Sequence, residues 1–237
     1  MLVSDPAVEL FLSQDKACSI MSPKYTRPID ITFQKGLATM IKILAINGSY
    51  RDDGITDQTV EALAQAIEAT GAEVEIILLR EYPIEFCLNC RVCTQQPGAT
   101  PGECVHHDGM QELIDKVERA DGYILASPTN FGSVTAIFKR FMERLAVYAY
   151  WPWNINGPQF RKAQEPKKKA LLVSSCAAPG ILGRLLFGTD KQLKMTAKTI
   201  GAEIVGTLFT GMIAKEQHPK LAEGVLAKIT VLAGRLV

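Results

Sequence analysis

The sequence predicts one doubly wound α/β domain, with a five-stranded parallel sheet and helices on both faces. Two observations support this fold class. Short apolar segments alternate five times with segments of helical periodicity along residues 40–237. The short segments are apolar at successive positions, as parallel strands are when helices cover both of their faces. No internal repeat or low-complexity block interrupts the alternation, so we expect a single domain.

The first elements follow Met40. IKILAIN at residues 41–47 is a β-rich apolar segment that ends in a glycine turn, which predicts a strand. Residues 56–71 predict a helix that closes in a glycine, because apolar residues recur on one face. A second strand is expected at 73–79 and, after a cysteine-rich stretch, a helix at 110–120. The apolar face of the first helix consists of Val60, Leu63, Ala64 and Ile67.

The later elements repeat this order. GYILASP at residues 122–128 predicts a buried strand, and residues 134–148 predict a helix with one apolar side. The remaining strand, helix, strand and closing helix are expected at 169–175, 191–201, 203–211 and 220–236.

Composition and charge limit the classes of binding partner that we expect. The 237 residues are 47% hydrophobic and 22% charged, as in ordinary globular proteins, and the formal net charge is +1. So small a charge creates no strong field for nucleic acid or anionic lipid, and we expect neither nucleic acid nor membrane as a partner. No apolar stretch reaches the 18 residues of a membrane-spanning helix.

Residues 1–39 precede the regular pattern and are expected to be an extension of unknown role, whereas residues 40–237 form the domain. The N-terminus lacks a basic region and carries Asp5, Glu9 and Asp15 among its apolar residues, unlike a secretory signal. We therefore expect a cytoplasmic protein with reduced thiols, in which neighbouring cysteines favour metal or redox chemistry over structural disulfides.

The loop after the first strand, NGSYRDDGITDQ (47–58), has polar groups suited to a phosphate. It has neither the G-x-G-x-x-G of dinucleotide folds nor the Gly-Lys-Ser/Thr ending of a P-loop. Ser49, Arg51 and Thr56 instead lie before or at a helix N-terminus, where backbone N–H groups, the helix dipole and a guanidinium can hold an anion. Alternatively, Thr56 is only an N-cap and Arg51 only a surface side chain.

The loop after the third strand, ASPTNFG, can accommodate a flat ring system. Pro128 favours a tight turn, and Gly132 permits close approach of another group to the backbone. Thr129, Asn130 and Phe131 are expected at the strand end, where a polar heterocycle could dock on main-chain groups. The alternative is an ordinary strand-to-helix turn.

Taken together, NGSYRDDGIT, SPTNFGSVTAIFKRFMER and the cysteine stretch between them resemble the NAD(P)H-dependent FMN reductase family. Its members are flavodoxin-like flavoproteins, and the resemblance covers residues 40–212. The branch that includes the iron–sulfur flavoproteins is the most similar. The resemblance implies FMN as cofactor, NAD(P)H as electron donor and a homodimer or homotetramer.

The resemblance implies a binding role for individual residues of this sequence. Ser49, Arg51 and Thr56 match the FMN-phosphate loop. A third contact in the family follows the fourth strand, where Ser175 and Gly180 are candidates. The phosphate loop departs from the family in Asp52 and Asp53, whose carboxylates must point away from a phosphate. The residues that match the isoalloxazine loop are Pro128, Thr129, Asn130, Phe131 and Gly132.

Four of the six cysteines, Cys87, Cys90, Cys93 and Cys104, form a C-x2-C-x2-C-x10-C pattern. The resemblance implies that these four ligate a [4Fe–4S] cluster. Three alternatives stay open: zinc bound by four sulfurs, or by three plus His106 or His107; redox-active thiol pairs; and no metal at all. The other two cysteines, Cys18 and Cys176, are interpreted as structural.

The segment YAYWPWN (148–154) contains both tryptophans and two tyrosines. This aromatic cluster could cover a flavin face, form a subunit contact, or pack a long loop onto its own domain.

The sequence thus predicts an FMN-dependent oxidoreductase that passes electrons from NAD(P)H to a flavin, quinone or other small-molecule acceptor. We assign no catalytic acid or base, because the flavin carries the chemistry. One alternative is an iron–sulfur flavoprotein that relays electrons from a ferredoxin-like donor, and another is a regulatory relative without a cofactor. The sequence shows no determinant that distinguishes NADH from NADPH.

Overall fold

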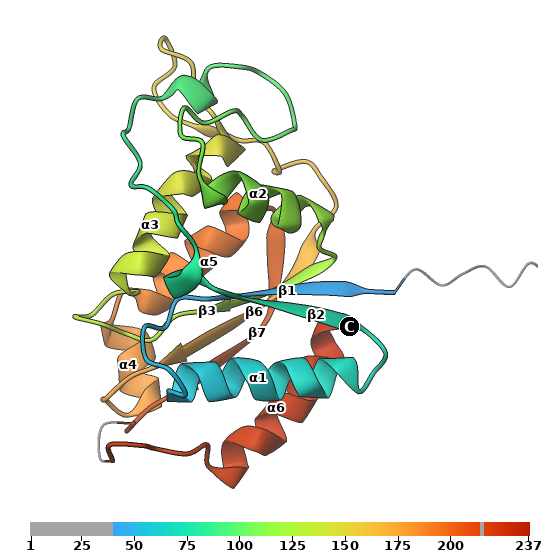
Figure 1. Cartoon of the computed structure of the whole chain (residues 1–237), viewed down its shortest axis with the longest axis vertical. Coiled ribbons are helices and arrows are strands. Elements are labelled where there is room, and N and C mark those ends of the chain that lie inside the picture. Colours follow the sequence, from blue (N-terminus) through green and yellow to red (C-terminus); the bar gives the residue numbers. More distant parts are fainter. Residues whose placement is uncertain (1–39, 214–215) are drawn as a thin grey trace, which may run out of the picture. The chain divides into compact units, whose positions relative to one another are not determined.

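The computed structural model describes residues 40–213 and 216–237, so the predicted extension at residues 1–39 and the expected role of Cys18 lie outside the described residues. Five strands form one parallel sheet in the order β2-β1-β3-β6-β7 (Figure 1). This is the flavodoxin strand order, and the predicted fold class is confirmed. The strands are β1 (Lys42–Asn47), β2 (Glu73–Leu78), β3 (Gly122–Ala126), β6 (Lys168–Ser175) and β7 (Ala202–Thr210).

Helices cover both faces of this sheet (Figure 1). On one face lie α1 (Ile55–Glu68) and α6 (Glu223–Leu236). On the other face lie α2 (Gly109–Arg119), α3 (Ala136–Arg144) and α5 (Thr189–Thr199). The strands can be buried on both sides because successive residues point to opposite faces.

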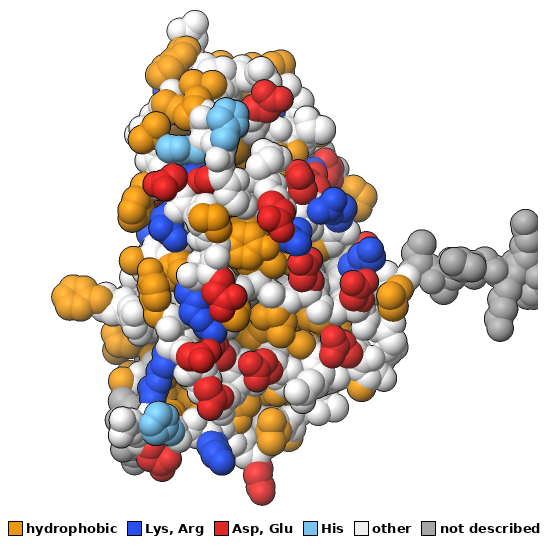
Figure 2. All heavy atoms as spheres, viewed as in Figure 1, with side chains coloured by type: hydrophobic (Ala, Val, Ile, Leu, Met, Phe, Trp, Pro, Cys, Tyr) orange, Lys and Arg blue, Asp and Glu red, His pale blue; other side chains and the backbone are white. Residues whose placement is uncertain are grey.

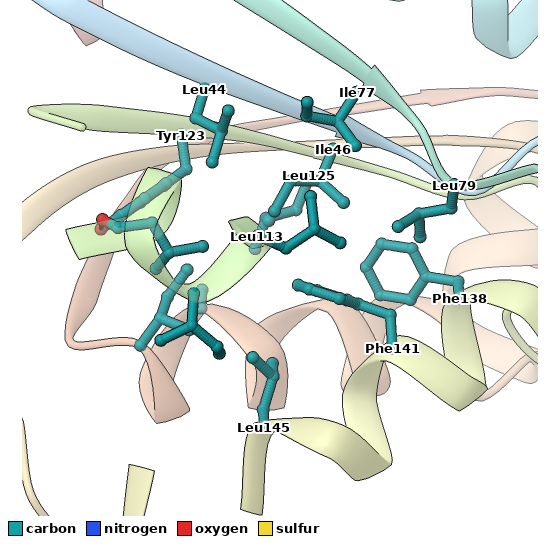
Figure 3. Packing of buried hydrophobic residues seen from close by; sticks show 14 of the residues in the cluster. Leu44, Ile46, Ile77, Leu79, Leu113, Tyr123, Leu125, Phe138, Phe141 and Leu145 are labelled. Carbon is teal, nitrogen blue, oxygen red and sulfur yellow. Dashed lines mark hydrogen bonds between the residues drawn. The ribbon is translucent and has the colours of Figure 1, made fainter. Parts of the chain in front are cut away.

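The two apolar cores show this alternation directly. Along β1, Ile43 and Ala45 pack toward α1 and α6, whereas Leu44 and Ile46 pack toward α2, α3 and α5. In the core on the side of α2, α3 and α5, Ile46, Leu79, Leu113 and Leu125 lie around the aromatic rings of α3 (Figure 3). The ring of Phe138 meets that of Phe141 edge to face, with centroids 5.8 Å apart. This core fixes α3, and with it the loop that connects β3 to α3.

The structure differs from the sequence prediction in the connecting segments. The helix expected at 134–148 ends at Arg144 and continues as the 3₁₀ helix η3 (Leu145–Tyr148). The long connector after η3 forms a two-stranded antiparallel ribbon of β4 (Ala149–Tyr150) and β5 (Gln159–Phe160). Short 3₁₀ helices, η1 (Leu79–Glu81) and η2 (Val92–Thr94), follow β2.

Helix α4 (Gly180–Leu186) is absent from the sequence prediction. Its sequence GILGRLL has no polar face to produce an amphipathic pattern, and its apolar side chains are largely exposed. Like the loops after β1, β3 and β6, it lies near the carboxyl ends of the strands (Figure 1). That edge of the sheet therefore collects the segments that sequence analysis assigned to ligand binding.

Acidic and basic side chains are interspersed on the face of the molecule shown in Figure 2. Apolar side chains gather at its top, over the cysteine-bearing segment and the β4–β5 connector; the exposed ones include Phe86, Leu88, Val92 and Trp153. Among the helices of residues 40–213 and 216–237, none has the length and apolar character needed to cross a bilayer.

Candidate functional site

A cavity of about 280 Å³ opens at the carboxyl ends of β1, β3 and β6. Ser175 and Cys176, at and just after the end of β6, also line it, so the cysteine interpreted as structural borders this cavity. Gly180 does not line it and begins α4 instead. Of the residues predicted to bind a cofactor, the cavity is lined by Ser49, Arg51, Thr56, Pro128, Thr129 and Asn130.

The loop after β1 is held by its own polar groups and by α3. The Asn47 side-chain oxygen accepts a hydrogen bond from the Ser49 amide at 2.9 Å, and the Ser49 hydroxyl accepts one from the Arg51 amide at 3.2 Å. Thr135, the N-cap of α3, donates its hydroxyl to the Gly48 carbonyl at 2.6 Å. This bond joins the loop after β1 to the loop after β3, so the two sides of the cavity are fixed relative to each other.

The N-terminus of α1 faces this cavity without a side-chain cap. Gly54 occupies the N-cap position with extended backbone, and it makes no side-chain capping hydrogen bond. First-turn N–H groups and the helix dipole then favour a bound anion. Thr56 lies inside the helix, so the alternative that it is merely an N-cap does not hold. Its hydroxyl lies 2.9 Å from that of Ser175, which ties α1 to β6.

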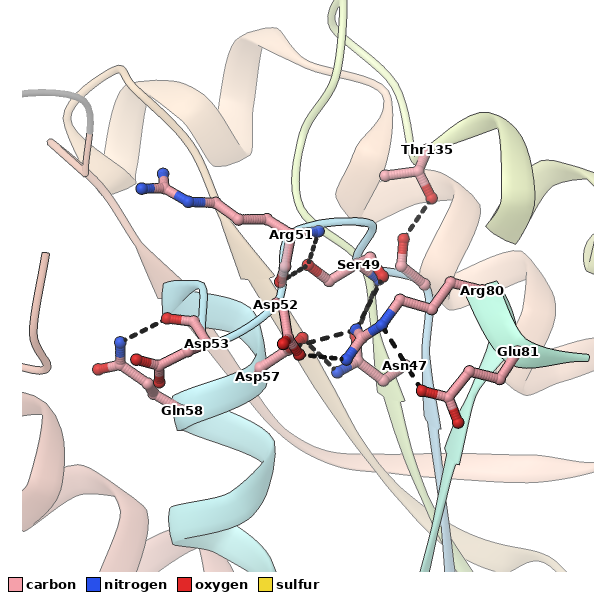
Figure 4. A network of polar contacts seen from close by, with 11 residues as sticks. Asn47, Ser49, Arg51, Asp52, Asp53, Asp57, Gln58, Arg80, Glu81 and Thr135 are labelled. Atoms are coloured by element: carbon pink, nitrogen blue, oxygen red, sulfur yellow. Dashed lines mark hydrogen bonds and ion pairs between the residues drawn. The ribbon is translucent and has the colours of Figure 1, made fainter. Parts of the chain in front are cut away.

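Arg80, which no sequence pattern indicated, braces the loop after β1 from its position in η1 (Figure 4). Its guanidinium donates to the buried Asp57 carboxylate at 3.0 Å and to the Ser49 carbonyl at 3.2 Å. A second nitrogen pairs with Asp52 at 2.9 Å. Asp52 therefore turns away from the cavity, as the prediction required, while the Arg51 guanidinium points away from this network (Figure 4).

The loop after β3 ends in a tight hairpin. The backbone N–H and C=O groups of Asn130 and Ser133 pair at 2.9 and 3.0 Å. Both central residues are left-handed, with φ of 50° at Phe131 and 77° at Gly132, as in a type I′ turn. Phe131 is fully exposed at the tip. The structure thus brings neither Phe131 nor Gly132 to the cavity, and their predicted flavin contacts stay predictions.

Residues 87–104, here called the cysteine segment, form a second cavity of about 210 Å³. All four predicted ligands line it as free thiols. Two of their sulfurs accept hydrogen bonds: Cys87 from the Asn89 amide at 3.4 Å, and Cys104 from Arg144 at 3.5 Å. The ten residues between Cys93 and Cys104 therefore loop back and return the fourth thiol to the other three.

The sulfurs lie close enough to affect one another. Burial, together with the neighbouring thiolates of Cys104, Cys87 and Cys90, raises the pKa of Cys93 to about 11. At neutral pH the Cys93 side chain is therefore a neutral thiol in this cavity, and a thiolate there would need a positive centre beside it. Within the described ranges, however, no three His, Cys, Asp or Glu side chains converge as they would around one metal ion.

A zinc ion and a four-iron cluster make different demands on these four sulfurs. A single Zn²⁺ needs its sulfurs at about 2.3 Å from one point. In a [4Fe–4S] cluster each thiolate binds a different iron, so the four sulfurs stand further apart. His106 also lines the cavity. Its Nε2 lies 3.0 Å from the Phe86 carbonyl oxygen, so this nitrogen is already in contact with the backbone.

Trp151 and Trp153 pack onto the cysteine segment of their own domain. Of the three alternatives given for the aromatic cluster, this is packing of a long loop onto its own domain. The Arg91 guanidinium lies 4.0 Å from the ring centroid of Trp151 and 4.3 Å from that of Trp153. It also donates to the Trp151 carbonyl at 2.7 Å. Arg91 is left-handed, with φ of 63°, which costs on the order of 1 kcal/mol for a residue with a Cβ. The two rings stabilise this conformation.

Arg161, just after β5, organises the same segment. Its guanidinium donates to the carbonyls of Val147, Gly98 and Cys93 at 2.9, 2.9 and 3.2 Å. A Cβ at Gly102 would overlap the Cys93 carbonyl oxygen, so only glycine fits this approach. The loop between the third and fourth cysteines is therefore closely packed.

Comparison with known proteins shows which families and proteins this chain is similar to. The sequence profile of the family described as NADPH-dependent FMN reductase matches residues 41–184. An iron–sulfur flavoprotein of Methanocaldococcus jannaschii is 36% identical over 104 residues, which cover 44% of this chain and 51% of that protein. An iron–sulfur flavoprotein of Archaeoglobus fulgidus is 36% identical over 112 residues, which cover 47% and 49%. The chain thus spans about half the length of these curated relatives.

A solved structure shows the same fold at low identity. The FMN-dependent NADH-azoreductase of Bacillus anthracis, in complex with FMN, superimposes with a TM-score of 0.61 at 13% identity. The superposition covers 83% of this chain and 99% of that chain, and it establishes the fold alone. The family profile covers more than half of the sequence, from the first strand into α4. The chain therefore belongs to the NADPH-dependent FMN reductase family.

Proposed function

We propose that the protein is an FMN-dependent oxidoreductase that binds its flavin in the cavity at the ends of β1, β3 and β6. The observation that carries this proposal is the meeting of an uncapped α1 N-terminus with Arg51, Thr56 and the residues after β3 in one cavity. The first set suits a phosphate and the second set suits a polar ring. Membership of the family supports the same cofactor.

Each residue would then act by binding or orientation. The α1 amides, the Thr56 hydroxyl and the exposed Arg51 guanidinium hold the phosphate. Pro128, Thr129 and Asn130 present main-chain and side-chain polar groups to the ring edge. When bound, FMN accepts a hydride and passes electrons on, so the chain needs no acid or base of its own.

The donor in this proposal is NAD(P)H, and the acceptor is a flavin, a quinone or another small molecule. The family description, which names NADPH, supports the donor. As the resemblance implied, we propose a homodimer or homotetramer in the cytoplasm.

A second candidate function is that of an iron–sulfur flavoprotein. Cys87, Cys90, Cys93 and Cys104 would hold a [4Fe–4S] cluster that exchanges single electrons with a ferredoxin-like donor. The observation that favours it is the gathering of four free thiols in one cavity. The two relatives described above are themselves iron–sulfur flavoproteins, which supports this candidate.

The FMN proposal is tested by binding. In the double variant Arg51→Ala/Thr56→Val, the loss of a charge-assisted contact should weaken FMN binding about tenfold or more. Arg119→Ala removes the same charge from an exposed position on α2 and serves as the matched control. FMN affinity within twofold of the control in the double variant would refute the phosphate site.

The cluster proposal is tested separately, by assay of iron and acid-labile sulfide after anaerobic reconstitution. Four of each per chain support the cluster, and the absence of both removes it.

A further inference from the structure

Arg144 is a buried cation beside one of the four thiols. Its side chain is only 1% exposed, at the C-terminal end of α3. One guanidinium nitrogen donates to Asp108 at 2.6 Å and to the Glu85 carbonyl at 2.9 Å. The other donates to Asp108 at 3.0 Å and to the Cys104 sulfur at 3.5 Å. The fork of the guanidinium therefore fixes its direction toward the sulfur.

Asp108 holds this cation in place. Its carboxylate also accepts from the Glu85 amide at 2.7 Å and from the Met110 amide at 3.1 Å, and it is the N-cap of α2. Burial acts to raise the pKa of Asp108, but the bonds from Arg144 and the two amides lower it to about 2. The carboxylate is thus ionised at neutral pH and is anchored by the loop at Glu85 and by α2 as well as by α3.

The other arginines near the cysteine segment act on different groups. Arg161 donates to backbone carbonyls, and Arg91 lies between two indole rings. Among the arginines that the structure describes, Arg144 alone donates to a sulfur. A hydrogen bond and a fixed positive charge at a ligating sulfur are two of the features by which proteins set the potential of an iron–sulfur cluster.

We propose that Arg144, held by Asp108, is a positioning residue that orients Cys104 and raises the reduction potential of the cluster. This inference rests on the proposed [4Fe–4S] site. One electron from a ferredoxin-like donor enters the cluster, no bond is made or broken, and the cluster becomes more negative by one charge. The nearby cation and its N–H···S bond stabilise the reduced state more than the oxidised state.

The test compares midpoint potentials of reconstituted protein. The principal variant is Arg144→Gln/Asp108→Asn, which neutralises both partners and so leaves neither charge buried without the other. Lys139→Gln removes the same positive charge from an exposed position on α3 that has no sulfur contact, and it is the matched control. The cluster is titrated with dithionite and followed by EPR, after far-UV circular dichroism has confirmed the fold.

The double variant should keep the iron and sulfide content of the unmodified protein and become harder to reduce. A tenfold change in the reduction equilibrium corresponds to about 59 mV for one electron, and a downward shift of at least that size is expected. If the double variant does not fold, Arg144→Lys gives the same test. Its single ammonium can pair with Asp108 but lacks the fork that also reaches the sulfur, so its potential should fall as well.

Three results would overturn the inference. Potentials equal to that of Lys139→Gln in both the double variant and Arg144→Lys would remove the role of Arg144 and leave the cluster standing. A folded double variant without iron and sulfide would show that the pair builds the site and does not tune it. An unmodified protein that takes up no iron or sulfide would remove the cluster, and the inference with it.

Discussion

The ion pair between Arg80 and Asp57 is predicted to hold the loop after β1 in its binding conformation. The Arg80 side chain is 15% exposed and that of Asp57 is 4% exposed. In Arg80→Met, Asp57 loses its only cationic partner within the described residues, and the Ser49 carbonyl loses a donor. Asp57 keeps a hydrogen bond from Asn47 at 2.7 Å.

The cost can be worked from these contacts. Removing one partner of a buried pair costs about 3–5 kcal/mol. Asp57 retains the Asn47 bond and lies in the first turn of α1, where the helix dipole stabilises a negative charge. We therefore expect a smaller loss, of about 2–3 kcal/mol in the free energy of unfolding, at or just below the lower limit of that range. For a domain of this size the melting temperature should fall by about 4–12 °C.

Urea unfolding measures this prediction through a double-mutant cycle of Arg80→Met and Asp57→Asn. The pair should show a coupling of at least about 1 kcal/mol. Asp52→Asn is the control, because Asp52 also pairs with Arg80 but is 94% exposed, so its loss should cost less than about 0.5 kcal/mol. The reasoning fails if Arg80→Met is no more destabilising than Asp52→Asn.

Three further perturbations test other parts of the molecule. The lowered pKa of Asp108 stabilises the fold above its ordinary value of 3.8, and this stabilisation of up to about 2 kcal/mol should be lost as pH falls toward 2. Unfolding free energies between pH 7 and 2.5 should show that loss, and Asp108→Asn should lack it. Gly102→Ala should displace the Cys93 carbonyl and speed proteolysis in the cysteine segment, whereas Gly157→Ala, which meets open space, should not. Trp151→Ala removes one of the two rings that sandwich a guanidinium, so amide exchange should rise in the cysteine segment and stay unchanged in the sheet; equal exchange in both would contradict this role.

The fold could be predicted from sequence because its signal is local. Each strand and helix of the sheet core carries its own apolar pattern, and the turns after β1 and β3 carry their own polar residues. Six of the eight predicted flavin-binding residues accordingly lie around one cavity. Of the two residues that do not line it, Phe131 and Gly132, Phe131 is the more instructive. Its left-handed backbone at a hairpin tip points it into solvent, and a residue with a Cβ gives no signal of that conformation.

The arginines that brace the two sites could not be predicted in the same way. Arg80 meets Asp57 across 23 positions, Arg144 meets Asp108 across 36, and Arg161 meets Cys93 across 68. In sequence each is a single charged residue without a visible partner, which favours an exposed side chain. Their burial depends on which carbonyls and carboxylates the fold brings to them, and only the three-dimensional arrangement contains that information.

The phosphate claim is tested most directly by comparing FMN with riboflavin, which differ only in that group. Fluorescence titration of the purified full-length chain measures both dissociation constants under the same conditions. FMN should bind at least about tenfold more tightly, which corresponds to about 1.4 kcal/mol from the α1 amides, Arg51 and Thr56. Equal affinities for the two flavins, or binding of neither, would contradict the proposed site.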